Sequence, residues 1–407
     1  MEQKLNKDQK WLSKKYLGYK FLTNLFFASA VWLYFYRIFI NDWQIGILDG
    51  LAFAIGLIAE IPSGALADRF GRDKMVKLGQ FLAGSGFLIQ AFGSSFIPFF
   101  VGQAIMVSGV AFVSGADEAL FFEKLKFDRK SVNWRKLVTR GSQVSLISLL
   151  TTAVIGGWLH DINPRIPWIL TGLSFISSVF LIWSIKDTRV ETNKEKVLVE
   201  IKKYLISIKS GFAQFGTPKL WFYVPIIITV QGLFYTSGWG LLRLILLDRF
   251  RFSPFLGSLV IASSGLITVG ILALMHKHAE RISEKRVITL ISLLSVFALL
   301  LSVLNIGMWG YIVIFILYAG EHAFYPFMSE IINHKVEDEN QRATVLSVAS
   351  FIKSFPYVFL APIIGYLNTE GKLEYFLVVW SVLICISVVM YLRSKKKDSL
   401  VSLIEEK

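Results

Sequence analysis

The sequence predicts an all-α integral membrane protein with about twelve transmembrane helices in two pseudo-symmetric six-helix bundles. The 407 residues are 54% hydrophobic and have a mean hydropathy of +0.56, whereas soluble domains average about 45–50% apolar residues. Apolar runs long enough to span a bilayer, which takes about 20 residues, recur along the chain. All but seven of the 43 Lys and Arg residues fall on one side of these runs. Such an asymmetry marks the cytoplasmic side of a membrane protein.

The placement of charge predicts the orientation. The net charge of +14 would by itself also suit nucleic-acid binding. The positions of the basic residues relative to the spans distinguish that possibility from membrane topology. The seven exceptions lie on the opposite side or within spans, and they are Arg37, Arg165, Arg249, Arg251, Lys372, Arg243 and Lys353. We therefore expect a multi-pass protein of the cell membrane with both termini cytoplasmic, whose basic side contacts anionic lipids rather than nucleic acid.

The apolar runs place the spans in chain order, with Trp43, Trp168, Trp221 and Trp309 near span starts as interfacial anchors. The expected helices cover residues 17–38, 44–67, 75–93, 97–122, 137–159, 166–185, 220–247, 255–275, 287–304, 308–332, 343–367 and 375–392. The only long polar interruption carries apolar residues at helical spacing among lysines, which predicts an amphipathic helix on the inner leaflet. The expected divisions are an N-terminal bundle (1–186), this cytoplasmic linker (187–218), a C-terminal bundle (219–393) and a cytoplasmic tail (394–407).

One charged loop carries the most specific motif. Residues 64–74 read GALADRFGRDK, with the spacing G-x-x-x-D-R-x-G-R-x-K. The residues of the motif are Gly64, Asp68, Arg69, Gly71, Arg72 and Lys74. This loop closely resembles the signature of the major facilitator superfamily, where it joins helices 2 and 3 on the cytoplasmic side. It departs from that signature at Asp73, where a second basic residue is usual. The alternative is a solvated basic turn that only fixes topology.

An internal repeat agrees with this resemblance. A shift of 212 residues carries Asp68 onto Glu280 and Glu118 onto Glu330, and Arg140 and Arg342 open corresponding spans. Repeated six-helix halves are what the resemblance implies, with the substrate site between them at mid-membrane. It also implies that helices 1, 4, 7 and 10 line a central cavity, and that access alternates as one half rocks against the other.

Ionisable residues inside spans are functional candidates, because they are costly in a membrane. Glu321 lies at the middle of its span and is the expected proton site, with His322 beside it. Lys353 lies near the middle of the next span and either binds an anion or pairs with Glu321. The alternative to a functional pair is a permanent Glu321–Lys353 ion pair that only holds two helices together. Glu60 precedes Pro62, and two interpretations are open: its side chain faces the inner end of the cavity, or it has a structural role. We expect Asp49 to reach the outer headgroups, and Arg243 is able to snorkel outward.

Polar and aromatic residues at mid-depth complete the predicted substrate site. They are Asn24, Trp32, Gln231, Tyr235, Trp239 and Tyr325. Aromatic rings around a carboxylate suit bulky cations through cation–π contacts, although helix-spaced aromatics more often serve ordinary packing.

The resemblance also implies a cytoplasmic latch. Asp68 would meet the start of helix 11, and Arg69 would meet Asp117 or Glu118 at the end of helix 4, with Arg140 on the same side. Such a latch holds the halves in an outward-facing state. A solvated charge cluster is the alternative, since exposed pairs contribute only ~0–1 kcal/mol.

These features lead to a prediction of secondary active transport. The preferred function is proton-coupled export of amphipathic or cationic small molecules. Two patterns of proton-driven exporters are missing, an Arg within helix 4 and a Pro in the Gly156-Gly157 region of helix 5. One alternative is a carrier of an anion or nutrient that uses Lys353 and Arg243, and another is a non-transporting receptor or assembly protein.

Other activities have no matching motif. The sequence lacks a phosphate-binding loop, a metal-ligand spacing and a nucleophile–base set, and Cys385 is its single cysteine. We expect no enzyme activity, no cofactor and no metal. The expected partners of the chain, as a monomer, are a small-molecule substrate, protons and membrane lipids.

Overall fold

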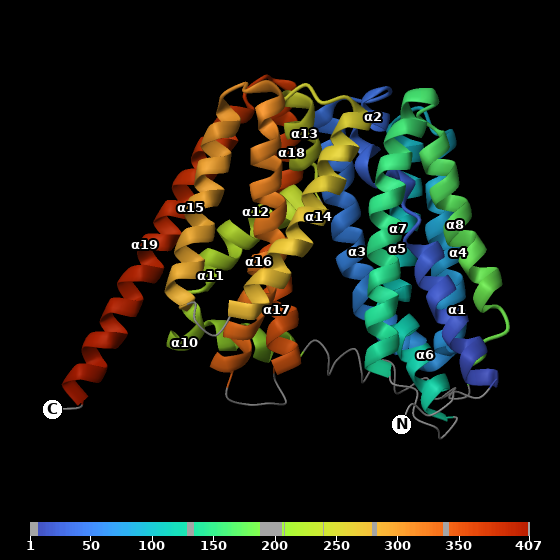
Figure 1. The fold of residues 1–407 in the computed structure, drawn as a ribbon, viewed down its shortest axis with the longest axis horizontal. Helices are drawn as coiled ribbons and strands as arrows, with labels where there is room; N and C mark the ends of the chain where they lie inside the picture. Colours follow the sequence, from blue (N-terminus) through green and yellow to red (C-terminus); the bar gives the residue numbers. More distant parts are fainter. Residues whose placement is uncertain are drawn as a thin grey trace. The chain divides into compact units, whose positions relative to one another are not determined.

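The structure is a computed structural model in which helices and short connections make up the described chain (Figure 1). It describes residues 7–127, 134–187, 206, 208–238, 240–278, 283–336 and 342–405. Within these ranges, nine helical stretches are long and apolar enough to cross a membrane, and Ile166–Ile182 is a shorter apolar helix. The all-α membrane architecture predicted from the sequence is confirmed.

The chain divides into two compact units. The first comprises residues 1–40 and 51–204, and the second comprises residues 41–50 and 205–407. Helix α3 (Asp42–Phe70) therefore contributes its first residues to the second unit and the remainder to the first. Most of the linker expected at 187–218 lies outside the described residues, and residues 208–215 are helical.

The first unit is a bundle of long helices. Besides α3, its elements are α1 (Lys7–Thr23), η1 (Phe27–Ala30), α2 (Trp32–Arg37), α4 (Arg72–Phe92), α5 (Phe96–Val113), α6 (Ala116–Phe127), α7 (Trp134–Ile162) and α8 (Ile166–Ile182). Helix α4 packs between α5 and α8, and α1 packs against α7 and α8. Glycines make the α4–α5 contact close, because ideal Cβ atoms built on Gly86 and Gly109 fall 2.4 Å from Gly102 O and 2.5 Å from Gly79 O.

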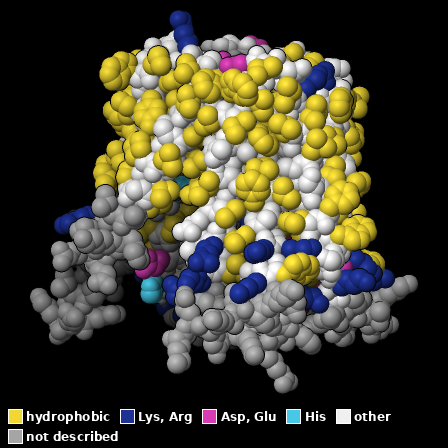
Figure 2. Space-filling view, turned by 45° about the vertical axis from the view of Figure 1, so that its right-hand side comes forward, with side chains coloured by type: hydrophobic (Ala, Val, Ile, Leu, Met, Phe, Trp, Pro, Cys, Tyr) yellow, Lys and Arg dark blue, Asp and Glu magenta, His cyan; other side chains and the backbone are white. Residues whose placement is uncertain are grey.

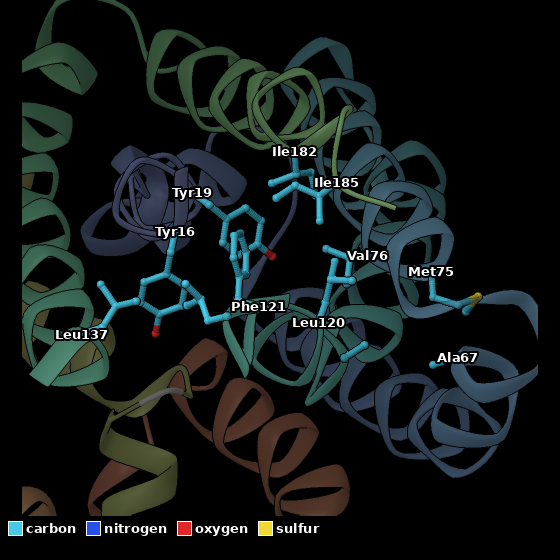
Figure 3. Packing of buried hydrophobic residues seen from close by; sticks show 12 residues of the cluster. Tyr16, Tyr19, Ala67, Met75, Val76, Leu120, Phe121, Leu137, Ile182 and Ile185 are labelled. Carbon is cyan, nitrogen blue, oxygen red and sulfur yellow. The ribbon is translucent and has the colours of Figure 1, made fainter. Parts of the chain in front are cut away.

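An aromatic cluster closes one end of the first unit (Figure 3). Tyr16 and Tyr19 of α1 flank Phe121 of α6, with ring centroids 5.1 and 5.6 Å from it. Leu137 lies beside Tyr16 and Ile182 beside Tyr19, while Met75 and Ala67 lie at the far side of the cluster from these rings. Burial of this apolar surface fixes the end of the bundle at which the Gly64–Lys74 loop connects α3 and α4.

The second unit contains more helix interruptions. Its further elements are α10 (Pro218–Trp221), α11 (Val224–Ile226), η2 (a π-helical segment, Ile227–Gln231), α12 (Gly232–Gly238), α13 (Leu242–Arg249), α14 (Pro254–His278), α15 (Glu284–Val303), η4 (Gly307–Gly310), α16 (Tyr311–Lys335), α17 (Arg342–Ser354), α18 (Tyr357–Thr369) and α19 (Leu373–Glu405). Helix α16 packs against α12, α14, α15 and α17, and α15 packs along α19 (Figure 1).

The expectation of uninterrupted spans was wrong for four segments. The predicted helix 17–38 is broken between α1 and α2, and 97–122 is broken at Ser114–Gly115, where Gly115 has a φ of 74° that favours glycine. The predicted helix 220–247 becomes α10 to α13, and 343–367 is broken before Tyr357. Hydropathy detects apolar length, and these breaks leave the apolar length unchanged.

The surface carries the expected separation of side-chain types. Figure 2 shows hydrophobic side chains spread over most of the visible face, with Lys and Arg gathered toward its lower edge. Large exposed apolar residues such as Phe180, Phe92 and Ile147, at 72%, 70% and 66% exposure, belong to this type of surface. An apolar belt of this kind suits lipid contact.

Candidate functional site

The carboxyl group of Glu321 lies directly against the backbone of a neighbouring helix. Glu321 stands in the middle of α16, and Gly238 is the last residue of α12. An ideal Cβ built on Gly238 would lie 2.0 Å from Glu321 Oε2 and 2.3 Å from its Cδ and Oε1. Any side chain at position 238 would displace the Glu321 carboxyl group, so this position requires glycine. The end of α12 therefore forms one wall of the site.

Three ionisable side chains act on the charge of Glu321. They are His322 on the same helix, Arg243 on α13 and Lys353 on α17. Within the part of the chain that the structure describes, no ion pair within 4.0 Å joins Glu321 to any of them. The fixed Glu321–Lys353 pair considered as a purely structural alternative is therefore not formed here. The carboxyl group has cations nearby and is not locked to one.

Aromatic rings hold the neighbours of Glu321. The ammonium group of Lys353 lies over the ring of Tyr325, 4.3 Å from its centroid. The ring of His322 stacks on Tyr318 at 4.5 Å, and its Nδ1 lies 3.0 Å from the Tyr318 carbonyl oxygen. His322 stands within α16, whereas Lys353 stands in the last turn of α17 and not at the middle of an unbroken helix. Neither ring contact neutralises the polar group that it holds.

Arg243 does not behave as an outward-reaching residue, so that expectation was wrong. Its Nε is buried and has no hydrogen-bond partner among the described residues, and its electrostatic neighbours are Glu321 and Tyr318. The cause is local: the α-helix ends at Gly238 and resumes at Leu242. This interruption changes the course of the chain immediately before Arg243.

Asp49 also contradicts its expected place at the headgroups. The hydroxyl of Tyr357, the first residue of α18, donates a hydrogen bond to Asp49 Oδ2. The same hydroxyl oxygen accepts a bond of 2.8 Å from the backbone N–H of Leu241. Asp49 is therefore joined through one phenol to the interruption between α12 and α13.

The remaining predicted substrate residues fall into two groups. In the second unit, Gln231 is buried in η2, and the ring of Tyr235 meets that of Tyr357 at 5.5 Å. Trp239 lies outside the described residues. In the first unit, Asn24 Nδ2 donates to Ser145 Oγ at 3.0 Å, and Trp32 packs edge-on against Tyr36. The structure thus places Tyr325 beside Lys353, Tyr235 beside Tyr357, and Asn24 and Trp32 in the other unit.

The motif segment is almost wholly helical, which corrects the loop expected at residues 64–74: α3 runs to Phe70 and α4 begins at Arg72, so Gly71 alone connects them. Gly71 caps α4 with a φ of 95°, a backbone conformation that requires glycine. Arg72 pairs with Glu123 at 2.7 Å, and its backbone N–H donates to Asp187. Asp73, the departure from the family signature, pairs with Lys77 at 2.9 Å. The odd acidic residue is thus neutralised within its own helix.

Other motif residues have simpler surroundings. Gly64 lies in α3, the guanidinium of Arg69 lies over the ring of Phe70 at 4.9 Å, and Lys74 is exposed. The side chain of Asp68 lies outside the described ones, as does the predicted repeat of the motif at Glu280.

The acidic pair expected in the latch has a partner that sequence reasoning missed. Lys20 Nζ lies 3.1 Å from Asp117 Oδ2 and 3.3 Å from Glu118 Oε1. These residues lie on α1 and α6, which pack against each other. Arg140 is exposed on α7, and Glu60 is exposed and accepts a hydrogen bond of 3.4 Å from Ser114. Lys20 stands near the inner end of an apolar span, and that position was the signal available in the sequence.

Comparison with known proteins identifies the family. The profile of the Major Facilitator Superfamily matches residues 20–359. The chain belongs to this superfamily. The resemblance seen in the Gly64–Lys74 loop is thereby confirmed, and so is the expectation that the chain is a transporter and not an enzyme.

Individual major facilitator proteins resemble the chain only distantly. An uncharacterized MFS-type transporter of Bacillus subtilis, YxaM, is 22% identical over 89% of this chain and 90% of its own length. An uncharacterized transporter of Buchnera aphidicola subsp. Schizaphis graminum is 27% identical over 42% of each chain, so less than half of that relative is matched. A class B tetracycline resistance protein of Escherichia coli is 27% identical over 32% of this chain and 33% of its own.

Solved structures confirm the major facilitator fold. The nucleoside transporter NupG superposes with a TM-score of 0.70 at 12% identity, covering 96% of this chain and 99% of NupG. A peptide transporter POT in complex with sulfate gives a TM-score of 0.69 at 15% identity, covering 95% of each chain. At these identities the likeness concerns the fold. Membership of the superfamily, shown by the match over residues 20–359, makes the chain a multi-pass membrane protein and a secondary transporter.

Proposed function

We propose that this protein is a proton-coupled exporter of amphipathic small molecules, with Glu321 as the proton-binding group. The observation that carries the proposal is the position of the Glu321 carboxyl against Gly238, near cations but without a fixed ion pair. A carboxylate within the membrane is costly, and taking up a proton removes that cost. Such a group is able to load and release a proton as its surroundings change.

The charges around Glu321 favour a substrate with an acidic group. Arg243 and Lys353 supply two positive charges near one carboxylate, so the cluster is positive whether or not Glu321 is protonated. An acidic substrate gains attraction from Arg243, whose buried Nε lacks a partner among the described residues.

Export of lipophilic cations is the second candidate, and the aromatic residues favour it. Tyr235 and Tyr325 supply ring faces of the kind that attract cations. However, the ring of Tyr325 already holds Lys353. The partial similarity to a tetracycline resistance protein supports export as the direction in both cases. The orientation with both termini cytoplasmic, supported by the basic edge in Figure 2, forms part of this proposal.

The experiment measures proton efflux from inverted membrane vesicles that hold an imposed proton gradient. A panel of matched amphipathic acids and amines is added, and a pH-sensitive dye reports dissipation of the gradient. An acidic substrate should give a signal that Arg243→Gln and Lys353→Gln abolish, and Glu321→Gln should remove the signal for every compound. Glu330→Gln, on the same helix with an exposed side chain, and exposed Lys372→Gln are matched controls.

One result separates the two candidate substrates, and another contradicts the proposal. Response to amines alone, insensitive to Arg243→Gln, selects the lipophilic-cation candidate over the acidic one. A full response in Glu321→Gln removes the carboxyl from proton coupling altogether.

A further inference from the structure

The first residues of α3 pack very closely on α18. Residues 41–50 belong to the second unit, although α3 continues into the first. Ideal Cβ atoms built on Gly46 and Gly50 would lie 2.3 Å from Ala361 O and 2.6 Å from Val358 O. One built on Gly365 would lie 2.2 Å from Asp42 O. The two helices therefore meet backbone to backbone, at the end of α3 that is remote from the Gly64–Lys74 loop.

Asp49 supplies a polar bond in this apolar contact. It accepts the hydroxyl of Tyr357, which in turn accepts the Leu241 N–H at 2.8 Å. The Tyr357 ring fills the space beside Gly240, where an added Cβ would come within 2.5 Å of it. One side chain thus connects α3, α18 and the interruption that precedes Arg243.

Among the described residues, Asp49 has no oppositely charged partner. The titratable groups that face it are Tyr357 on α18 and, beyond it, Tyr235 on α12, both phenols. On its own helix the next carboxylate is Asp42, seven residues earlier, which accepts a hydrogen bond from Asn368. Across the described ranges, no charged side chain acts on Asp49. An ionised carboxylate is thus held by one phenol, and a hydrogen bond to an ionised acceptor is stronger than one to a neutral acceptor.

We propose that Asp49 is a second proton-binding site, which fastens α3 to α18 when ionised and loosens them when protonated. The glycine contacts allow the two backbones to separate without steric obstruction, and the Asp49–Tyr357 bond adds the dependence on pH. The proton comes from the aqueous phase on that side. This role is additional to that of Glu321 and does not depend on the identity of the substrate.

Disulfide crosslinking tests the proposal without a transport assay. The backbone N–H of Trp43 donates to Thr369 Oγ1 at 3.0 Å, so cysteines at these two positions are close when the helices are together. In a Cys385→Ser background, Trp43→Cys and Thr369→Cys form the only pair. The oxidation rate is measured from pH 5 to 8 and divided by the rate of each thiol with a monofunctional reagent, which removes the titration of the thiols.

The expected normalised rate falls about fivefold from high to low pH, equivalent to about 1 kcal/mol at 1.4 kcal/mol per factor of ten. Asp49→Asn should hold the low rate at every pH, and Tyr357→Phe should do the same while keeping the carboxylate. Asp161→Asn and Tyr375→Phe, both at exposed positions, should behave as the parent pair.

Several outcomes overturn the proposal. The proposal is wrong if the crosslinking rate of the parent pair does not change with pH. It is also wrong if the pH profile survives in Asp49→Asn, because the titrating group would then be Asp42. If Asp49→Asn does not fold, the Tyr357→Phe variant replaces it, and a pH dependence like that of the parent pair in this variant also overturns the proposal. Repeating the measurement in Glu321→Gln should leave the profile intact, so failure of the Glu321 role and failure of this one are told apart.

Discussion

Replacing Gly238 by alanine tests whether the position of the Glu321 carboxyl matters for coupling. The added methyl carbon would lie 2.0 Å from Oε2, whereas ordinary contact begins at 3.4 Å. The carboxyl must therefore move by about 1.4 Å, the difference between these two distances. A misplacement of about 1 Å at a reacting group costs up to about 100-fold in a positioned reaction. We expect substrate-dependent proton flux to fall at least about tenfold by the same reasoning.

The same substitution should leave the fold intact. Gly238 is not one of the glycines with a positive φ, so alanine fits its backbone, and the displaced atoms are the end of a flexible side chain. The thermal midpoint of the purified protein should thus stay constant while transport falls. Gly270→Ala on α14 is the control, because nothing lies within 4 Å of its added Cβ. Full transport in Gly238→Ala, with an unchanged midpoint, would refute the reasoning.

Three further predictions concern stability and topology. Lys20→Gln removes the partner of Asp117 and Glu118. The thermal midpoint should fall by about 1 °C for a loss of about 1 kcal/mol in a chain of 407 residues, and an unchanged midpoint would mean that the pairing contributes nothing. Gly156→Ala should destabilise the folded protein by about 1–3 kcal/mol through overpacking, since its Cβ would lie 1.9 Å from Phe27 O. Gly270→Ala is the control, because its Cβ meets nothing within 4 Å. Equal yields of folded protein from both variants would contradict this contact. In a Cys385→Ser background, an impermeant thiol reagent applied outside intact cells should label Lys372→Cys and not Lys74→Cys, both exposed positions, and the reverse pattern would invert the orientation.

Apolar length and charge placement were enough to predict the helical membrane fold, because both are local properties of the sequence. The motif was recognisable for the same reason: its residues are neighbours in the sequence, and the positive φ of Gly71 is needed at a turn between two adjacent helices. Glu321 was found because a carboxylate in the middle of an apolar run is conspicuous. These features need no knowledge of which helices are neighbours.

The partners of the charged residues were not predictable in this way. Asp49 and Tyr357 are 308 residues apart, and Lys20 and Asp117 are 97 apart, so only the folded bundle brings them together. Arg243 was misplaced because a break between α12 and α13 leaves the hydropathy of the segment unchanged. The closeness of Gly238 to Glu321 likewise depends on the packing of two helices.

The most direct test of the proton role of Glu321 separates coupling from translocation in proteoliposomes. Purified protein is reconstituted with a substrate found in the vesicle panel, and two rates are measured: accumulation driven by a pH gradient, and exchange of labelled for unlabelled substrate without a gradient. We expect Glu321→Gln to lose accumulation and to retain exchange, while Glu330→Gln keeps both. Gradient-driven accumulation that persists in Glu321→Gln would contradict the account.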